Sequence, residues 1–368
     1  MHLFSAVPMP LMDRMILRSS LKEMIMSDVL TRDMKNFKRT REIRSTDILF
    51  AIANYPDRKS VLLGSSDAGV YELDLTTEKP DRIKFSGGHR SYVTGIAVME
   101  SQAVSCGYDG QLVWWDLQTR QAMRTINAHG KWIRRIVSVP SRNAFVSVAD
   151  DMRCRVWDAV SGERIADFTD HDAMTPHHFP SMLYAVAASP DGRWIATGDR
   201  VGHVAIWDTQ TWAKKAELEA PVMYTWDPKA RRHSIGGIRS LAFSPDSSQL
   251  AVGGTGKINN IDHLEGRSRL EVFDWQKGTR LHEFEDEKRK GLVEQIVWIP
   301  ESTWILAVGG DNKGFLNFFD TATNAMLHQD GCEGHIHGVT WDANAASLLV
   351  AAHERVEVWA WEKTPFEN

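Results

Sequence analysis

The feature that most constrains this chain is a short motif that returns along it, an aromatic or leucine residue followed in most cases by aspartate. It closes the strand-like runs "DGQLVWWDLQT" (109–119) and "DMRCRVWDAVS" (151–161). The seven occurrences are Leu73-Asp74, Trp115-Asp116, Trp157-Asp158, Trp207-Asp208, Phe273-Asp274, Phe319-Asp320 and Trp359-Ala360. Their spacings are 42, 42, 50, 66, 46 and 40 residues. Such a period indicates a repeat architecture, with seven units over 45–361 and insertions in the two longest intervals.

Each unit has the same internal pattern. The segment "GIRSLAFSPDSSQLAVGG" (237–254) consists of two strand-like runs joined by a Pro-Asp turn, and "SMLYAVAASPDGRWIATGD" (181–199) repeats it. A tight turn, a strand ending on the motif, a second turn and a last strand follow. Short Val/Ile/Leu/Trp runs bounded by Gly, Pro, Asp and Ser are typical of strands and turns. We therefore predict an all-β chain with four short strands in each unit.

The paired Trp-Asp, the Ser-Pro-Asp-Gly turn, the Gly-His at 88–89 and the period near forty resemble the WD-repeat family over 45–361. The resemblance implies an all-β fold, a seven-bladed β-propeller of four-stranded antiparallel blades, with about one blade per unit. It also implies loops on one shared face, the top, where the d–a and b–c connections of the blades meet.

The resemblance implies a hydrogen-bonded set of His, Ser, Asp and Trp inside a blade. The matching residues are His89, Ser105, Asp109 and Trp115 in unit 2, and His129, Ser147, Asp151 and Trp157 in unit 3. A His/Ser/Asp catalytic triad is the competing interpretation. Because the same trio occurs in two neighbouring units, we interpret both sets as structural, and we predict no catalytic residues.

Other units depart from this pattern at the equivalent positions. Unit 4 has Val201 in the aspartate position and Phe179 in the histidine position. Units 5, 6 and 7 have Ser234, Arg289 and Cys332 in the histidine position. We expect these units to be held by apolar packing.

The two ends of the chain are expected to meet. Unit 7 ends at "VEVWAWEKTPFEN" without residues for a fourth strand, whereas residues 34–44 alternate and precede unit 1. We predict that 34–44 supply the closing strand of the last blade, that 45–364 form the propeller, and that 1–33 are a helical or disordered extension. Closure removes open sheet edges.

Function is expected in the loops, because the strands of a propeller are scaffold. Three enlarged loops fall on the top face, at 171–182, 220–237 and 255–269. Aromatic and arginine side chains accompany them, as in many protein-interaction hot spots. The predicted partner-binding residues are Tyr92, Trp132, Arg134, Tyr184, Tyr224, Trp226 and Arg239. The alternative for Tyr224 and Trp226 is that they only pack their own loop.

Composition and charge limit the other classes of function. The net charge is −5, which argues against nucleic acid as a partner, and no apolar run is long enough for a membrane span. Three widely spaced cysteines favour a reducing compartment, and we expect a cytoplasmic protein. Fourteen histidines include five near the enlarged loops, at 171, 177, 178, 233 and 263, but none in a metal-ligand spacing. We predict no metal and no cofactor.

These observations favour a non-catalytic scaffold, a monomeric propeller within a larger complex, that binds a protein or peptide on its top face. An acidic or phosphorylated segment would suit the arginines. One alternative is an enzyme with a site in the central channel, although the starts of the innermost strands offer a single carboxylate, Glu294. The other is a nucleic-acid adaptor that uses the arginines at 134, 135, 231, 232 and 239.

Overall fold

The structure is a computed structural model, and it describes residues 33–57, 59–229, 232–259, 266–342 and 346–361. Within these residues all long elements are strands. The three short 3-10 helices are η1 (Met34–Asn36), η2 (Pro140–Arg142) and η3 (Pro221–Met223). The predicted extension 1–33 lies outside the described residues except for Asp33, as do His263, Arg231 and residues 362–364.

Five antiparallel sheets contain four consecutive strands each, and we call them blades 2 to 6 after their units. Blade 2 comprises β5 (Val93–Met99), β6 (Gln102–Gly107), β7 (Gln111–Asp116) and β8 (Gln121–Asn127). Blade 3 comprises β9 (Ile133–Val139), β10 (Ala144–Ala149), β11 (Cys154–Asp158) and β12 (Arg164–Phe168). Blade 4 comprises β13 (Leu183–Ala188), β14 (Trp194–Asp199), β15 (His203–Asp208) and β16 (Lys214–Glu219). Blade 5 comprises β19 (Ser240–Phe243), β20 (Gln249–Thr255), β21 (Arg267–Asp274) and β22 (Thr279–Lys290). Blade 6 comprises β23 (Leu292–Trp298), β24 (Trp304–Gly310), β25 (Gly314–Asp320) and β26 (Ala325–Cys332).

The remaining strands form one six-stranded sheet, the closing sheet, and one hairpin. The closing sheet has the order β27 (Ile336–Asp342), β28 (Ser347–Trp361), β1 (Phe37–Asn54), β2 (Ser60–Ser65), β3 (Val70–Asp74) and β4 (Arg82–Lys84). The hairpin pairs β17 (Tyr224–Asp227) with β18 (His233–Gly236).

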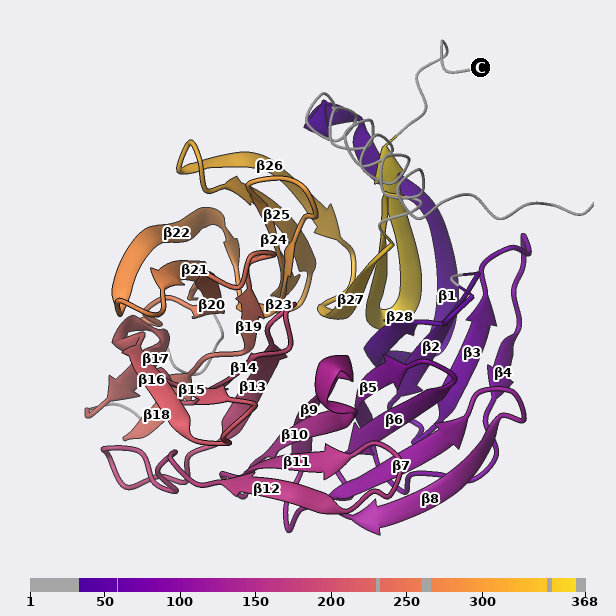
Figure 1. The fold of residues 1–368 in the computed structure, drawn as a ribbon. Helices are drawn as coiled ribbons and strands as arrows, with labels where there is room; N and C mark the ends of the chain where they lie inside the picture. Colours follow the sequence, from indigo (N-terminus) through magenta and orange to yellow (C-terminus); the bar gives the residue numbers. More distant parts are fainter. Residues whose placement is uncertain (1–32, 58, 230–231, 260–265, 343–345, 362–368) are drawn as a thin grey trace, which may run out of the picture.

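The sheets stand in a ring (Figure 1), which confirms the predicted propeller of four-stranded antiparallel blades. The predicted count of seven separate blades is not met, because the described strands form six large sheets. The cause is β1, which pairs with β28 from Phe37 to Ile48 and with β2 from Leu49 to Asn54. One strand thus joins the C-terminal strands to the first ones. Residues 34–36, predicted as strand, form η1 instead.

The position of a strand within its blade decides its burial pattern. In blade 2 the middle strands β6 and β7 are buried along almost their whole length, because neighbouring blades cover both of their faces. The outermost strand β8 alternates between exposed and half-buried residues. Residues of the innermost strands, β1, β5, β9, β13, β19, β23 and β27, line a central cavity of about 520 Å³.

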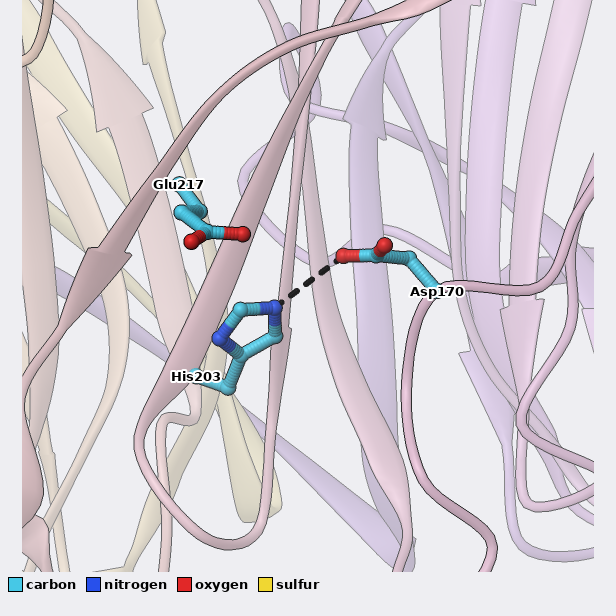
Figure 2. A group of neighbouring side chains, drawn as sticks. All are labelled: Asp170, His203 and Glu217. Carbon is cyan, nitrogen blue, oxygen red and sulfur yellow. Dashed lines mark hydrogen bonds and ion pairs between the residues drawn. The ribbon is translucent and has the colours of Figure 1, made fainter.

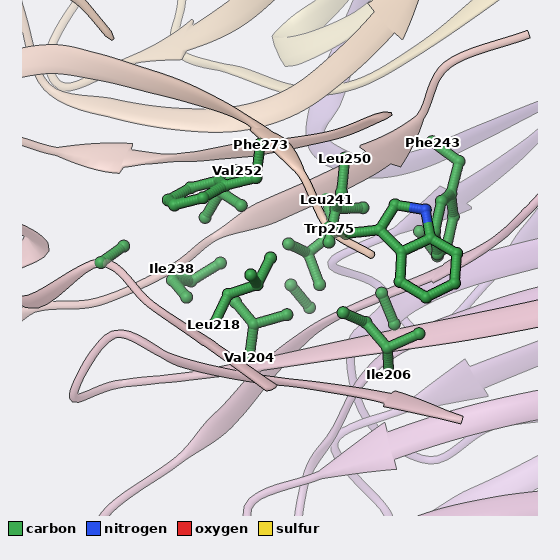
Figure 3. Close-up of a cluster of buried hydrophobic side chains, with 14 of the residues drawn as sticks. Val204, Ile206, Leu218, Ile238, Leu241, Phe243, Leu250, Val252, Phe273 and Trp275 are labelled. Atoms are coloured by element: carbon green, nitrogen blue, oxygen red, sulfur yellow. The ribbon is translucent and has the colours of Figure 1, made fainter. Parts of the chain in front are cut away.

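Apolar side chains fill the spaces between adjacent blades. Figure 3 shows the cluster between blades 4 and 5, where Ile206 and Leu218 meet Leu250, Phe273 and the ring of Trp275. Fully burying one such side chain contributes about 1.5–3 kcal/mol relative to leaving it exposed.

Candidate functional site: the top face

The predicted polar set of blade 2 is formed by buried side chains. Trp115 Nε1 donates to Ser105 Oγ at 2.8 Å, and the same hydroxyl lies 2.7 Å from His89 Nε2. His89 Nδ1 lies 3.1 Å from both carboxylate oxygens of Asp109. Gly110 follows with φ +73°, and a Cβ there would lie 2.5 Å from the carbonyl oxygen of His129. The "DG" turn is therefore required for the contact between blades 2 and 3.

Blade 3 contains the same set at nearly the same distances. Trp157 Nε1 donates to Ser147 Oγ at 2.9 Å, Ser147 Oγ lies 2.8 Å from His129 Nε2, and His129 Nδ1 lies 3.0 Å from Asp151 Oδ1. Burial lowers the pKa of His129, against the opposing effect of Asp151. Burial raises the pKa of Asp151, but its bond to His129 and the further contacts lower it overall. The ring is therefore neutral and the carboxylate charged at neutral pH.

The prediction for unit 4 was wrong, because blade 4 holds a complete set from other residues. Trp207 Nε1 donates to Thr197 Oγ1 at 3.1 Å, and Thr197 Oγ1 lies 2.8 Å from His171 Nε2. His171 Nδ1 lies 2.9 Å from Asp199 Oδ2. The aspartate stands two residues before Val201, and the histidine stands at the start of the enlarged 171–182 loop. His171 thus has both ring nitrogens occupied.

The expectation that the later units rely on apolar packing alone was also wrong. In blade 5 the buried Arg269 and Glu271 pair at 2.7 Å. Asn317 of blade 6 donates to Asp286 Oδ2 at 3.0 Å, and both side chains are buried. In the closing sheet, Trp359 Nε1 donates to the buried Glu357 at 2.8 Å. Buried polar groups need partners, and these units supply them with side chains that the motif does not describe.

The starts of the innermost strands meet at one polar cavity, which we call the channel mouth. Its volume is about 190 Å³. It is lined by Phe50, Thr94, Tyr108, Arg134, Arg135, Tyr184, Arg239, Glu294 and His337. Of the predicted partner-binding residues, Arg134, Tyr184 and Arg239 therefore come together here.

Beside the channel mouth lies a row of aromatic rings, which we call the aromatic row. It consists of Tyr92, Tyr108 and Trp132. The Trp132 and Tyr108 rings are stacked with centroids 4.3 Å apart, and Tyr92 lies 5.6 Å from Tyr108. Trp132 is 49% exposed and Tyr92 is 43% exposed. Large aromatic faces left open to solvent are typical of contact surfaces.

Tyr108 was not predicted, although a sequence signal exists for it. It stands in the β6–β7 turn directly before Asp109, and in blade 3 Asp150 stands directly before Asp151. In blade 2 this residue, Tyr108, belongs to the row, and in blade 3 Asp150 pairs with Arg134, which contacts the row. A second cavity of about 440 Å³ is lined by Tyr108, Trp132, Asp150, Met182 and neighbouring residues.

Arg134 has its hydrogen-bonding capacity largely used within the protein. Its Nε and Nη2 atoms each donate to Asp150 at 2.7 Å, and Nη1 donates to the Tyr108 hydroxyl at 2.8 Å. Its guanidinium carbon lies 5.2–5.3 Å from the ring centres of Tyr108, Trp132 and Tyr184. Arg134 therefore holds the aromatic row in place, and its charge is paired.

Tyr224 and Trp226 lie on β17 and contact the enlarged loop that holds His177. The His177 ring stacks on Trp226 at 4.3 Å, and His177 Nδ1 lies 2.9 Å from the Tyr224 hydroxyl. Both residues are half-buried. Thr225 Oγ1 accepts a hydrogen bond from Ile258 N at 3.0 Å. The three enlarged loops thus pack on one another. This arrangement favours the alternative interpretation, in which Tyr224 and Trp226 serve loop packing.

Asp170, His203 and Glu217 form a group whose donor atoms lie within 4.8 Å of one another (Figure 2). His203 lies between two carboxylates, with Nε2 3.1 Å from Asp170 and Nδ1 2.6 Å from Glu219. Burial lowers the pKa of His203, but these carboxylates raise it overall. Lys214 Nζ donates to Asp170 at 2.7 Å and to Glu217 at 2.9 Å. A metal would have to displace the ammonium group and deprotonate the imidazole, so the residues fit an ion-pair network better.

In the part of the chain that the structure describes, no helix is long and apolar enough to cross a membrane.

Four-stranded antiparallel sheets around a central channel, fastened by buried polar sets, define a β-propeller. A family model described as "WD domain, G-beta repeat" matches residues 120–158, 170–208 and 228–260. The matched segments include the tryptophans of blades 3 and 4. The chain therefore contains WD repeats in the matched segments and folds as a β-propeller.

Three relatives illustrate the breadth of the similarity. Telomerase protein component 1 of Mus musculus is 24% identical over 267 residues, covering 72% of this chain and 9% of that protein. Protein hir-1 of Neurospora crassa is 27% identical over 187 residues, covering 47% and 17%. Guanine nucleotide-binding protein subunit beta of Oryza sativa subsp. japonica is 26% identical over 223 residues, covering 58% and 56%. The chain spans less than two thirds of the length of each relative.

Proposed function

We propose that this protein is a non-catalytic scaffold that binds a peptide or protein partner on its top face. The observation that carries the proposal is the aromatic row, which leaves two large rings exposed beside two cavities. Solvent-exposed aromatics bury a large area at low entropic cost on binding. The propeller acts in the cytoplasm, as a monomeric unit of a larger complex, with the closing sheet serving as two blades of a seven-bladed ring.

The chemistry of the channel mouth supports a binding role over catalysis. Its one carboxylate is Glu294. Burial raises the pKa of Glu294, but the contact with His335 and the charge of Arg239 lower it to about 2. A general base works best with a pKa near the operating pH, so Glu294 is a poor proton acceptor.

Affinity capture with paired variants tests the scaffold proposal. Trp132→Ala removes an exposed ring of the aromatic row. We choose it over Arg134→Ala, because the latter would also leave Asp150 without its ion-pair partner. The matched control is Met123→Ala, because Met123 is 55% exposed on the outermost strand of blade 2. We expect Trp132→Ala to lose partners that wild type and Met123→Ala retain. Identical partner sets for all three proteins would contradict the proposal.

A further inference from the structure

The channel mouth holds three arginines, and their pairing differs. Arg134 forms a two-pronged ion pair with Asp150, so these two charges cancel. Arg135 Nη2 donates to the backbone oxygen of Glu294 at 2.9 Å, and burial lowers the pKa of its guanidinium. Among the described residues, no carboxylate lies within ion-pair distance of Arg135.

Arg239 is positioned by an aromatic ring. Its guanidinium carbon lies 3.7 Å from the centre of the Tyr184 ring, and its Nε atom is buried without a hydrogen-bond partner in the described part of the chain. Tyr184 is itself buried. The ring fixes the guanidinium plane, which leaves part of its fork of donors available to a ligand.

The charges of the channel mouth do not balance. Arg135 and Arg239 carry two positive charges against the one negative charge of Glu294. His337 adds none at neutral pH, because burial and the neighbouring His335 lower its pKa to about 3. His335 Nε2 lies 3.6 Å from Glu294 Oε1. Burial lowers the pKa of His335, but the contact with Glu294 raises it overall. A half-buried positive charge without a partner is costly. An anion that binds beside it supplies the missing partner and is therefore bound well.

We propose that the channel mouth binds one anionic oxygen group, a carboxylate or phosphate, carried by a partner segment that lies across the aromatic row. This inference rests on the proposed function and adds to it the chemistry of the bound segment. The cavity of about 190 Å³ holds several times the volume of a water molecule, about 30 Å³. Guanidinium groups match carboxylate and phosphate oxygens in forked geometry, and Arg135 and Arg239 supply them.

Thermal unfolding of the full chain in inorganic phosphate, against chloride at equal ionic strength, tests the anion site. The variant is Arg239→Gln, and the matched control is Arg90→Gln, an exposed arginine on the same face. We expect phosphate to raise the melting temperature of wild type and of Arg90→Gln, with at least tenfold weaker apparent binding in Arg239→Gln. Arg239→Lys, which keeps the charge, should restore part of the response and guards against misfolding. No phosphate-specific shift in wild type, or an equal shift in Arg239→Gln, would overturn the proposal.

Capture experiments separate this inference from the scaffold proposal. Loss of partners by Trp132→Ala but not by Arg239→Gln would leave the scaffold standing and overturn the anion site. A phosphate response that requires Arg239, with partners unchanged in Trp132→Ala, would support the anion site and contradict the aromatic surface. Elution of a captured partner by phosphate, but not by chloride, assigns the anion to the partner. Stabilisation by phosphate without elution would overturn that assignment in favour of a free anion.

Discussion

Three buried tryptophans, one in each of blades 2, 3 and 4, donate their indole N–H to a hydroxyl of the same blade. The motif predicts this for Trp115 and Trp157 because their histidines and aspartates stand at matching distances. It fails at Trp207, because counting back from the tryptophan reaches Val201 and passes over Asp199. The carboxylate comes from Asp199, two residues before the expected position, and the ring comes from His171 instead of the expected position 179, so the geometry is kept although the spacing is not.

Asp199→Ala tests this correction. Asp199 is 1% exposed and accepts hydrogen bonds from His171 and from the backbone N–H groups of Val201 and His203. Removing it orphans buried donors, so we expect a loss of about 2 kcal/mol or more in the free energy of unfolding. Val201→Ala, the matched control, should cost less than about 1 kcal/mol. Urea unfolding measures both, and the reverse order would contradict the assignment.

His129 gives a pH dependence of known sign. Its pKa is lowered from 6.5 by burial, so the unfolded chain binds the proton more readily than the folded protein. Its contribution to stability is therefore complete above pH 6.5 and decreases as the pH falls below that value towards the folded pKa. We expect the difference in unfolding free energy between wild type and His129→Gln to be largest near pH 8 and to narrow by pH 5. A constant difference, measured by denaturant titration at each pH, would count against a neutral buried ring.

At the scale of elements, the repeat predicts the strands well and the connections poorly. Alternation and turn residues locate the four strands of each regular unit. They do not show that 220–237 contains a hairpin, because the pairing of β17 with β18 depends on the packing of His177 and Phe179 from another loop. Side-chain exposure also depends on such packing: Trp132 and Trp226 are both predicted partner-binding residues, but Trp132 is exposed whereas Trp226 is half-buried.

The closing strand β1 is expected to be the most sensitive element. Phe37 is 1% exposed and contacts the rings of Phe318, Trp359 and Trp361. Phe37→Ala should lower the free energy of unfolding by about 3–5 kcal/mol. Thr46→Ala, at an exposed position of the same strand, should change it by less than about 0.5 kcal/mol. Equal melting temperatures for the two variants would show that residues 37–44 are dispensable for closure.

At the scale of the whole molecule, the apolar clusters between adjacent sheets link the blades into one unit. Leu250 is fully buried between blades 4 and 5 (Figure 3). We expect Leu250→Ala to lower the free energy of unfolding by about 2–5 kcal/mol. Because each blade is covered by its neighbours, the variant should still unfold in one shared transition, at a lower temperature. Calorimetry distinguishes the outcomes: a second, separate transition in the variant would mean that blades unfold independently.

β1 pairs with both β2 and β28, and this pairing sets an order of events during biosynthesis. Arg39 pairs with Glu357, 318 residues further along the chain, so the first described strand leaves the ribosome long before its partner strand exists. Until then β1 presents an unpaired edge, and loop closure over such a distance is slow. Nascent chains of this protein should therefore depend on chaperones until translation reaches β28, and ribosome-stalled chains ending before it should be the aggregation-prone species.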